Sequence, residues 1–541
     1  MNAALVAPDL VALTDAYRQR EGCAALDDAR WVPSLKAWVC PPTPANVMAI
    51  AAMCPLPDEL RVLLPEPPRR EPVEDKGAWL TRAVPYAHQR HAVAAAMAVL
   101  PERGGFAMLM DMGTGKTLAA LEVVSRLHAA GTVRRVLVVA PAAVVPVWAA
   151  EASAYLGSPH ELAMLLGPRA TRLKALGDLS GGLQIAVVNY ESAWRLVPEF
   201  VAWGPDMVIA DESQRIKGHA TRQTKGVTAI GAAVHYRLAL TGTPVTNSPL
   251  DVFAQWRYLD PSIFGTSYYA HRARYAVMGG YEVGGRSVQV VGYRRLDEMA
   301  ARAHSIAYRV TKAEALDLPE TCDTIVPVTL GPRARRAYDE MARESVAAYE
   351  GGETSAACIL TRLLRLSQMT SGSVPRDDGT TEVLGDEKMA ATVEVVEDAV
   401  SGGSKVVVFC RFRSEIAALL AHFGESAEAL HGDVPLTARG EAVRRFQEDE
   451  SVRVMVAQLQ VGGAGITLTA ASVMVFASLS FSYADYEQAK ARIHRIGQGA
   501  KCTYVHVVAA DTVDVTVLDA LRAKRDVASL IVDRGAAVYG R

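Results

Sequence analysis

Residues 79–261 alternate between short apolar runs and longer segments with helical periodicity. The apolar runs are FAMLM, VLVVA, IAVVNY, MVIAD and YRLALTG, and each has the length of one strand. Strands that alternate with helices form a parallel sheet covered by helices on both faces. This stretch therefore predicts a first α/β lobe, although the order of the strands in the sheet cannot be read from the pattern.

The same alternation returns in residues 386–541, where the runs are KVVVFC, EALHG, VRVMVAQ, SVMVFAS and YVHVVAA. Residues 262–385 lose it and contain a glycine-rich hairpin pattern, VMGGYEVGGRSVQVVGY, followed by helical segments. Residues 65–78 are proline-rich and charged, as in a linker, and residues 1–64 precede them. The predicted fold is α/β: two parallel-sheet lobes, helical insertions and a small N-terminal module.

Composition narrows the class of protein. A chain of 541 residues is too long for one hydrophobic core, and a net charge of −2 means that any nucleic-acid contact must come from a local basic groove. The seven cysteines are scattered without a CxxC pair, which indicates reduced thiols and no zinc site. The longest apolar run, residues 136–150, contains two prolines and is too short for a membrane span. We expect a cytoplasmic protein.

A glycine-rich loop follows the FAMLM run and precedes the helical pattern LAALEVVSRLHAA. Backbone N–H groups of such a loop, at the start of a helix, bind phosphate oxygens. Lys116 would reach the β- and γ-phosphates of ATP, and the Thr117 hydroxyl would hold Mg²⁺. The strict pattern has glycine at position 110, where this chain has Met110, so a simple helix N-cap is the alternative. The candidate loop residues are Gly113, Thr114, Gly115, Lys116 and Thr117.

Two adjacent carboxylates, Asp211 and Glu212, end the MVIA run. Ligands bind at the carboxyl ends of parallel strands, so these side chains are expected at the same edge of the sheet as the glycine-rich loop. One carboxylate, Asp211, would hold Mg²⁺, and Glu212 would orient the attacking water. Alone, such a pair is more often a helix cap; behind a GKT sequence it indicates an ATP site.

Hydrolysis also needs positive charge on the transferring phosphoryl group, which arginine supplies. The second lobe contains QAKARIHRIGQ, with Arg492 and Arg495 one helical turn apart and Gln488 a turn before them. In isolation this would be a solvated basic helix. Its place in a second α/β lobe, after GGAGITLTAA, favours a catalytic role for all three residues.

The order of motifs resembles helicase superfamily two and, within it, the Swi/Snf-type DNA translocases. The resemblance spans about residues 84–532. The segment QAKARIHRIGQ is its most specific part, because DEAD-box RNA helicases lack the RIGQ ending. SLSFSYADYEQA lacks the Trp-Asn-Pro of eukaryotic remodellers and is closer to compact bacterial or bacteriophage members. The matching segments are PYAHQ, MDMGTGKT, VVAPAAVVPVWAAE, VVNYESA, IADESQRIKG, LALTGTPVTNS, VVVFCRF, VGGAGITLTAA and QAKARIHRIGQ.

The resemblance implies two RecA-like lobes that hydrolyse ATP with Mg²⁺ and move along double-stranded or branched DNA, in the nucleoid of a bacterial or phage-infected cell. It places Gln89 at the adenine and Gly465 near the nucleotide. His88 and Gln214 depart from the family pattern, which has Tyr before the glutamine and His after the acidic pair. The residues that match nucleic-acid motifs are Asn189, Thr243, Asn247, His431 and Thr467.

Other functions stay open. The chain could be the motor of a restriction or defence complex whose nuclease is a separate partner, since the 43 residues after Gln498 (541 − 498) are too few for a nuclease domain. An RNA helicase and a catalytically silent DNA clamp are further alternatives. Residues 1–64 faintly resemble the module that engages branched DNA in the HepA-related annealing helicases; a small cap packed on the first lobe is the alternative.

Overall fold

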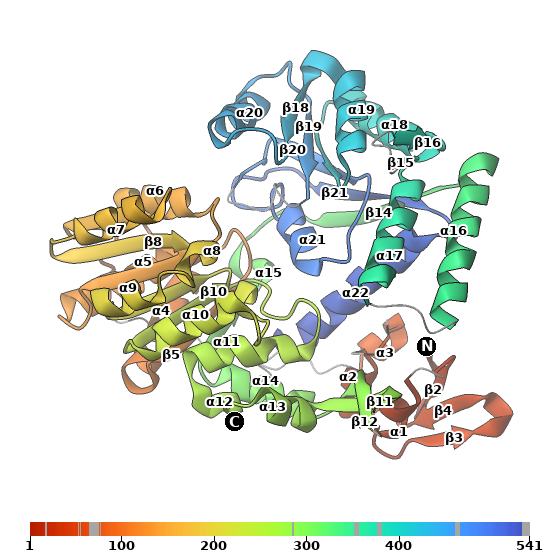
Figure 1. Ribbon diagram of the computed structural model, residues 1–541, viewed down its shortest axis with the longest axis horizontal. Coiled ribbons are helices and arrows are strands. Elements are labelled where there is room, and N and C mark those ends of the chain that lie inside the picture. The colour runs from red at the N-terminus through yellow and green to blue at the C-terminus, as the bar shows by residue number, and fades with distance from the viewer. Residues whose placement is uncertain are drawn as a thin grey trace. The chain divides into compact units, whose positions relative to one another are not determined.

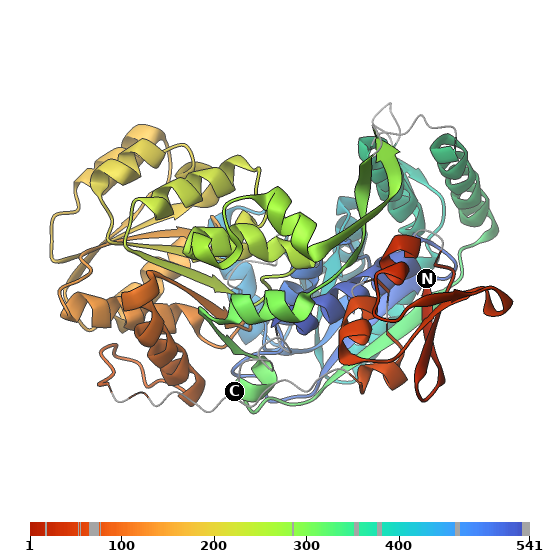
Figure 2. The ribbon, with the colours of Figure 1, turned by 90° about the horizontal axis from the view of Figure 1, so that it is seen from below.

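The computed structural model describes residues 1–16, 19–51, 53–54, 56–63, 75, 77–283, 286–350, 356–375, 381–459 and 466–532. The chain divides into two compact units. The first comprises Met1–Leu316 and the C-terminal end from Arg522, and the second comprises Asp317–Leu521. Each unit contains its own central parallel sheet (Figure 1 and Figure 2). The predicted α/β class is therefore confirmed.

The first unit is built on seven parallel strands in the order β13-β5-β10-β9-β6-β8-β7. The five predicted runs form β5, β6, β8, β9 and β10, and two further strands, β7 and β13, lie at the two edges. Because β10 lies between β5 and β9, the loops after these three strands are neighbours. The strands are β5 (Gly105–Met110), β6 (Arg135–Ala140), β7 (His160–Met164), β8 (Leu183–Asn189), β9 (Met207–Asp211), β10 (Tyr236–Thr241) and β13 (Ala307–Val310).

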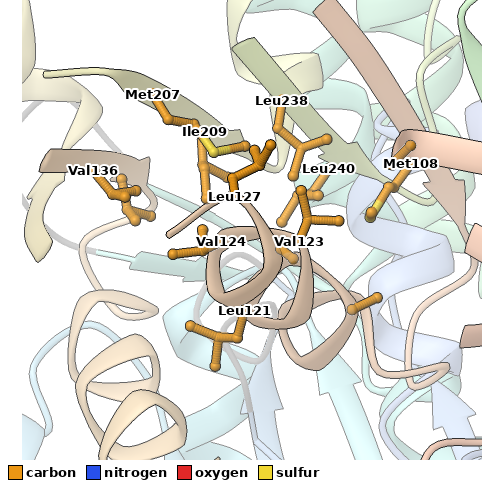
Figure 3. Close-up of a cluster of buried hydrophobic side chains, with 14 of the residues drawn as sticks. Met108, Leu121, Val123, Val124, Leu127, Val136, Met207, Ile209, Leu238 and Leu240 are labelled. Carbon is orange, nitrogen blue, oxygen red and sulfur yellow. The ribbon is translucent and has the colours of Figure 1, made fainter. Parts of the chain in front are cut away.

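One face of this sheet packs on α5 (Lys116–Ala129), a helix without internal glycine or proline. Figure 3 shows Leu127 of α5 among Met108, Ile209 and Leu238 of three different strands. Strand residues two apart, such as Leu238 and Leu240, point to this same face because side chains alternate along a strand. Each such fully buried side chain contributes roughly 1.5–3 kcal/mol. This packing fixes the start of α5 at the carboxyl edge of the sheet.

The other helices of the unit surround the sheet. α4 and α6 join α5 in the same buried cluster. α10 packs on α8, α9 and α11, and α11 packs on β10 and β5. The helices are α4 (Ala87–Arg103), α6 (Val145–Tyr155), α7 (Arg169–Gly177), α8 (Tyr190–Ala193), α9 (Val197–Trp203), α10 (Arg222–Ala232), α11 (Val252–Leu259), α12 (Pro261–Phe264), α13 (Tyr268–Tyr275), α14 (Leu296–His304) and α15 (Lys312–Ala315), with the 3-10 turns η3 (Ser213–Ile216) and η4 (Pro249–Asp251).

The N-terminal module is a four-stranded antiparallel sheet in the order β1-β2-β4-β3. Its α1 packs on the hairpin of β11 and β12, and its α2 packs on α14. A Cβ atom at Gly22 of α1 would lie 2.6 Å from the carbonyl oxygen of Val291 in β12, so this contact requires glycine. The elements are β1 (Asn2–Ala7), β2 (Leu10–Thr14), α1 (Arg20–Ala24), β3 (Arg30–Val32), β4 (Ala37–Cys40), α2 (Pro44–Ala51), α3 (Asp58–Arg61), β11 (Ala276–Val283) and β12 (Arg286–Tyr293).

The second unit contains six parallel strands in the order β14-β21-β20-β17-β19-β18. Five are the predicted runs, and β14 adds an edge. The strands are β14 (Thr321–Val328), β17 (Lys405–Cys410), β18 (Ala427–Leu430), β19 (Val454–Gln458), β20 (Ala471–Phe476) and β21 (Cys502–Ala509). The remaining elements are α16 (Pro332–Glu350), α17 (Ala356–Thr370), β15 (Ser373–Pro375), β16 (Thr381–Val383), α18 (Glu387–Ser401), α19 (Arg413–Phe423), α20 (Leu436–Glu448), α21 (Tyr483–Lys490) and α22 (Val513–Val532), whose residues from Arg522 belong to the first unit.

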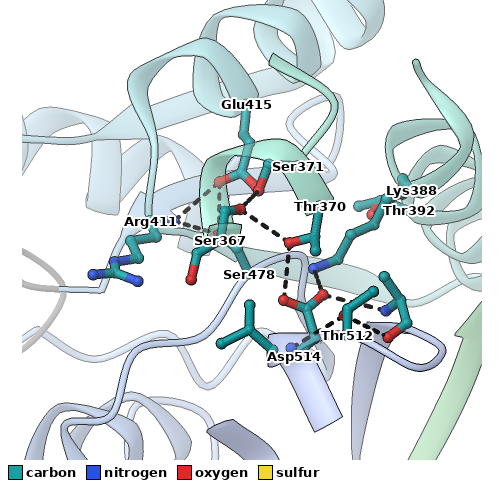
Figure 4. Close-up of polar contacts among 12 residues, drawn as sticks. Ser367, Thr370, Ser371, Lys388, Thr392, Arg411, Glu415, Ser478, Thr512 and Asp514 are labelled. Carbon is teal, nitrogen blue, oxygen red and sulfur yellow. Dashed lines mark hydrogen bonds and ion pairs between the residues drawn. The ribbon is translucent and has the colours of Figure 1, made fainter. Parts of the chain in front are cut away.

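A polar network joins the helices of the second unit beside its sheet (Figure 4). Lys388 of α18 forms an ion pair with Asp514 of α22, and Thr370 at the end of α17 donates a hydrogen bond of 2.9 Å to the same carboxylate. Lys388 is only 4% exposed, and removing either charge would leave the other buried without its partner. These contacts connect elements far apart in the sequence and hold α17 and α18 in place.

Three findings bear on the expectations from composition. Among the described residues, no helix is long and apolar enough to cross a membrane. The described cysteines are free thiols: Cys23, Cys40, Cys54, Cys410 and Cys502 are buried, and Cys322 is half-buried. Within the described part of the chain, no three histidine, cysteine or acidic side chains gather as a metal site.

Candidate nucleotide site

The glycine-rich loop turns sharply between β5 and α5. Gly113 has φ of 84° and Gly115, the N-cap of α5, has φ of 81°, which is a conformation that favours glycine. Met110, where the strict pattern has glycine, is still the last residue of β5, and its side chain belongs to the buried core. The departure at position 110 is therefore accommodated by the strand and leaves the turn itself intact.

Gln89 in α4 lies directly against this loop. Its Nε2 donates to the carbonyl oxygens of Thr114 at 3.2 Å and Gly115 at 3.4 Å, while its Oε1 accepts from the Tyr86 backbone N–H at 2.9 Å. A Cβ atom at Gly115 would lie 2.0 Å from Gln89 Nε2. His88 Nε2 donates to the Thr114 carbonyl as well, at 2.8 Å. The segment that is predicted to contact the adenine is thus hydrogen-bonded to the glycine-rich loop.

Lys116 is half-buried at the start of α5. Its Nζ donates to the carbonyl oxygens of Met110 at 2.9 Å and Asp111 at 3.2 Å. Burial lowers the pKa of Lys116, and the nearby charges of Glu212 and Asp211 oppose that shift. The ammonium group therefore has two neutral carbonyls as its acceptors, and the charges of the two predicted acidic residues act on it.

Arg309 in β13 holds Asp111, the first residue of the loop. Arg309 was not predicted as a site residue from the sequence. Its Nη1 donates to Asp111 Oδ1 at 2.7 Å, and the backbone N–H of Lys312 donates to Asp111 Oδ2 at 2.9 Å. The Arg309 side chain is only 9% exposed, so this ion pair is shielded from solvent. Nothing in the local sequence around Arg309 pointed to a partner 198 residues earlier in the chain.

Asp211 ends β9 and is buried, with both oxygens engaged. Oδ2 accepts from the Trp148 indole N–H at 2.8 Å, and Oδ1 accepts from the Glu212 backbone N–H at 2.9 Å. Burial, and then the charge of Glu212, raise the pKa of Asp211 to about 7. A buried carboxylate of this kind is costly without a cation, which suits a residue that would bind one.

A chain of hydrogen bonds leads from Glu212 to the loop after β10. Gln214 Nε2 donates to Glu212 Oε2 at 2.8 Å, and Gln214 Oε1 accepts from the Thr241 hydroxyl at 2.7 Å. The Thr243 backbone N–H in turn donates to Thr241 Oγ1 at 2.9 Å. The amide of Gln214 is suited to this place because it donates on one side and accepts on the other. Gln214, which departs from the family pattern, is thus the middle residue of this series of hydrogen bonds.

The candidate residues of the second unit lie at and after α21. Gln488 is in the helix, but α21 ends at Lys490, so Arg492 and Arg495 lie in the turns that follow. The expectation that both arginines continue one helix is wrong, because the chain leaves the helix one residue before Arg492. Both donate instead to the Ile466 carbonyl, at 3.2 Å and 3.4 Å. Gly465 lies outside the described residues.

Three predicted nucleic-acid residues follow strands of the first sheet. Asn189 ends β8 and donates to the Glu191 carboxylate at 2.8 Å. Thr243 and Asn247 follow β10, and Asn247 Oδ1 accepts from Lys524 Nζ at 3.2 Å. They therefore lie at the same edge of the sheet as the phosphate loop, where parallel strands end.

The other two predicted nucleic-acid residues, His431 and Thr467, lie next to strands of the second sheet. His431 comes directly after β18 and is half-buried, with Nδ1 3.8 Å from Asp433 Oδ2. Thr467 is half-buried in the segment before β20. Neither side chain has a contact that distinguishes a nucleic-acid ligand from a structural residue, so both assignments stay predictions.

A glycine loop between a strand and a helix, with a lysine and two carboxylates at one sheet edge, defines the class of phosphate-loop proteins. Residues 88–372 match the SNF2-related domain, and residues 387–497 match the helicase conserved C-terminal domain. The chain belongs to the SNF2-related family. Its membership of the helicase class of ATPases, expected from the motif order, is confirmed by these two matches.

Relatives of the chain include both long and short proteins. One relative is the SWI/SNF-related matrix-associated actin-dependent regulator of chromatin subfamily A-like protein 1 homolog from Caenorhabditis elegans. It is 27% identical, and the match covers 79% of this chain and 59% of the relative. The DNA annealing helicase and endonuclease ZRANB3 of Mus musculus is 25% identical over 79% of this chain and 39% of its own. Putative protein p41 of Acyrthosiphon pisum secondary endosymbiont phage 1 is 26% identical over 78% and 93%. The chain thus spans well under two thirds of its first two relatives.

Proposed function

We propose that the protein is a DNA-stimulated ATPase that uses ATP hydrolysis to move along double-stranded or branched DNA. The observation that supports this most directly is the hydrogen-bonded chain Glu212–Gln214–Thr241. It connects the residue assigned to the attacking water with the loop that carries two nucleic-acid candidates, Thr243 and Asn247. Such a connection gives bound DNA a physical route to the hydrolytic residue.

The residues present fit ATP and Mg²⁺. The positive φ angles of Gly113 and Gly115 turn the loop as a phosphate cradle requires, and a Cβ at Gly115 would collide with Gln89. Lys116 would bind the β- and γ-phosphates. Thr117 and the buried carboxylate of Asp211 would hold Mg²⁺, which neutralises charge on the phosphate oxygens when bound. Gln89 would contact the adenine while retaining the loop.

We assign hydrolysis to residues of both units. Glu212 would orient the water, and Gln214 would hold the Glu212 carboxylate by its 2.8 Å hydrogen bond. Arg492 and Arg495 would stabilise the charge on the transferring phosphoryl group, with Gln488 and Gly465 near the same phosphate. ATP binding then depends on the first unit alone, whereas turnover depends on the second as well.

We propose DNA as the partner because a relative is named a DNA annealing helicase. Its contacts would be chiefly to phosphates, which position a protein without reading sequence. The protein would then act in the nucleoid of a bacterial or phage-infected cell. The N-terminal module would act as an accessory that engages branched DNA. The module's packing on β11, β12 and α14 would hold it on the first unit.

The test is the steady-state ATPase rate at fixed salt without nucleic acid and with single-stranded DNA, duplex DNA, forked DNA and RNA. Strong stimulation by duplex or forked DNA is expected. Stimulation by RNA alone would replace the DNA translocase with an RNA helicase. Stimulation by none of these, followed by activity on addition of a co-purified nuclease, would identify the motor of a restriction complex.

A further inference from the structure

A cavity of about 290 Å³ lies in the first unit, between α10, α11 and the segment that follows η3. His219, which follows η3, lines it together with Lys225 of α10 and Arg257 of α11. Alanine side chains of α10 and α11, Ala229 and Ala254 among them, line it as well. The cavity therefore combines cationic groups with small apolar ones, and no part of the nucleotide site contributes to it.

The cations around this cavity lack acidic partners. Within the part of the chain that the structure describes, Lys225, Arg257 and the neighbouring Arg272 form no ion pair with a carboxylate. The charges of Arg257, Arg272 and Lys225 add to burial in lowering the pKa of His219, with no acidic group opposing them. The carboxylate of Asp251 accepts backbone hydrogen bonds from Thr246 to Ser248. Asp251 keeps its negative charge, but among the described residues none of the three cations is paired with it, so their positive charge is available to a ligand.

Aromatic rings lie next to these cations. His219 stacks on Tyr268 of α13 with ring centroids 3.7 Å apart and planes 11° apart. Arg272 lies over the ring of Tyr269, 5.3 Å from its centroid, and Tyr269 is 68% exposed. An exposed aromatic ring beside cationic side chains is a feature of surfaces that bind nucleic acid.

We propose that this cavity binds a phosphodiester group of DNA, as a contact separate from those that the sequence motifs suggest. Lys225 and Arg257 are the ligands. The proposal rests on the proposed function, since it names a further DNA contact of the same motor. A phosphodiester suits the site because it is an anion with more than one acceptor oxygen. The Lys225 ammonium of α10 and the Arg257 guanidinium of α11 can each donate to one of them.

The cavity is also connected to the nucleotide site. The turn η3 begins directly after Glu212, and the Ser213 hydroxyl donates to Gln255 Oε1 at 2.8 Å. Gln255 lies on α11, two residues before Arg257. A phosphate held by Lys225 and Arg257 therefore contacts α11, the helix that is hydrogen-bonded to the residue after Glu212. Occupancy of the cavity should consequently be visible in the DNA-stimulated ATPase rate as well as in binding.

The test compares duplex-DNA affinity of the full chain across salt concentrations for a charge-removing and a charge-conserving double variant. Lys225→Gln with Arg257→Gln removes about two phosphate contacts, so the slope of log K against log salt falls by about 2. The DNA concentration for half-maximal ATPase stimulation rises at least about tenfold. Lys225→Arg with Arg257→Lys keeps most of the wild-type slope. Lys174→Gln, which removes an exposed cation of α7 on β7 at the sheet edge, leaves the slope unchanged.

The outcomes separate the two proposals. If the wild-type protein binds DNA and the charge-removing variant, folded by its thermal unfolding profile, keeps the same slope, the cavity is not a DNA contact and the proposed function stands. A folded charge-conserving variant that loses the slope also overturns the inference, because charge is then not what matters. If the wild-type protein neither binds DNA nor responds to it, both proposals fail together.

Discussion

The candidate residues of the two units are held differently. At the carboxyl edge of the first sheet, the polar residues hold one another within a single unit: Asp211 is fixed by Trp148, and Glu212 by Gln214. In the second unit, Arg492 and Arg495 both donate to one carbonyl, that of Ile466, in turns beyond the end of α21. The first edge is organised for binding in advance, as electrostatic preorganisation requires. The comparison implies that ATP binding and ATP turnover can be separated by mutation.

Lys116→Ala should have the largest effect, since it acts on the edge where binding is organised. The lysine would contribute to phosphate binding and to the transition state, so kcat/KM should fall by about 10⁴. Equilibrium binding of a fluorescent ATP analogue and steady-state turnover measure the two parts. Lys174→Ala, an exposed lysine of α7, is the control. Wild-type turnover in the Lys116→Ala protein would remove the phosphate-loop assignment.

Arg495→Ala should separate ATP binding from ATP turnover. Turnover should fall by about 10³-fold because an arginine on the transferring phosphoryl group is lost, while ATP affinity stays near wild type. Glu212→Gln, at the first edge, should likewise bind ATP and hydrolyse it slowly. If Arg495→Ala weakens ATP binding as much as turnover, the division of labour between the units is wrong.

The two sheets also show which strands a sequence reveals. All ten predicted runs are strands, whereas the three that were missed, β7, β13 and β14, each lie at the edge of a sheet. β14, TCDTIVPV, is half exposed along its length and contains Pro327, so it lacks the continuous apolar run of a central strand. Burial on both faces makes a central parallel strand easy to recognise, and of the four edge strands of the two sheets only β18 was predicted.

The same physical limit applies to the site. Lys116, Asp211 and Glu212 were predictable because each follows or precedes a buried strand in a short, local pattern. Arg309 was not, since its partner Asp111 is 198 residues away and the contact exists only once β13 pairs with β5. Gln214 was visible only as a departure from the family. Its hydrogen bond to Thr241 depends on β10 lying beside β9.

Gln214→Ala should lower the rate of ATP hydrolysis without abolishing it. Glu212 would lose a hydrogen bond of 2.8 Å and Thr241 its acceptor, which costs about 1–1.5 kcal/mol, or about tenfold in kcat. Because the chain leads to the loop with Thr243, stimulation by DNA should fall more than the rate without DNA. Gln214→His, the residue usual in the family, should restore part of the stimulation. Equal losses with and without DNA would limit Gln214 to a local role.

The smallest effect concerns stability and arises from the buried carboxylate. Because burial raises the pKa of Asp211 from 3.8 to about 7, its protonated form favours the folded state at low pH. That stabilisation is complete below about pH 4 and is lost as the pH rises through 7. Asp211→Asn, which cannot ionise, should therefore gain in melting temperature relative to wild type as the pH rises from 5 to 8, by roughly a few degrees.

Thermal unfolding in EDTA without nucleotide measures the difference, since a bound cation would stabilise the ionised carboxylate and hide it. Asp178→Asn, at the exposed C-terminal end of α7, is the matched control and should show no such trend. The amide at position 211 also turns a donor toward the Glu212 N–H, which shifts the melting temperature equally at every pH. The trend with pH therefore isolates the charge. A flat difference would mean that Asp211 ionises at low pH without a cation, and the first edge would then be less prepared for Mg²⁺ than its geometry implies.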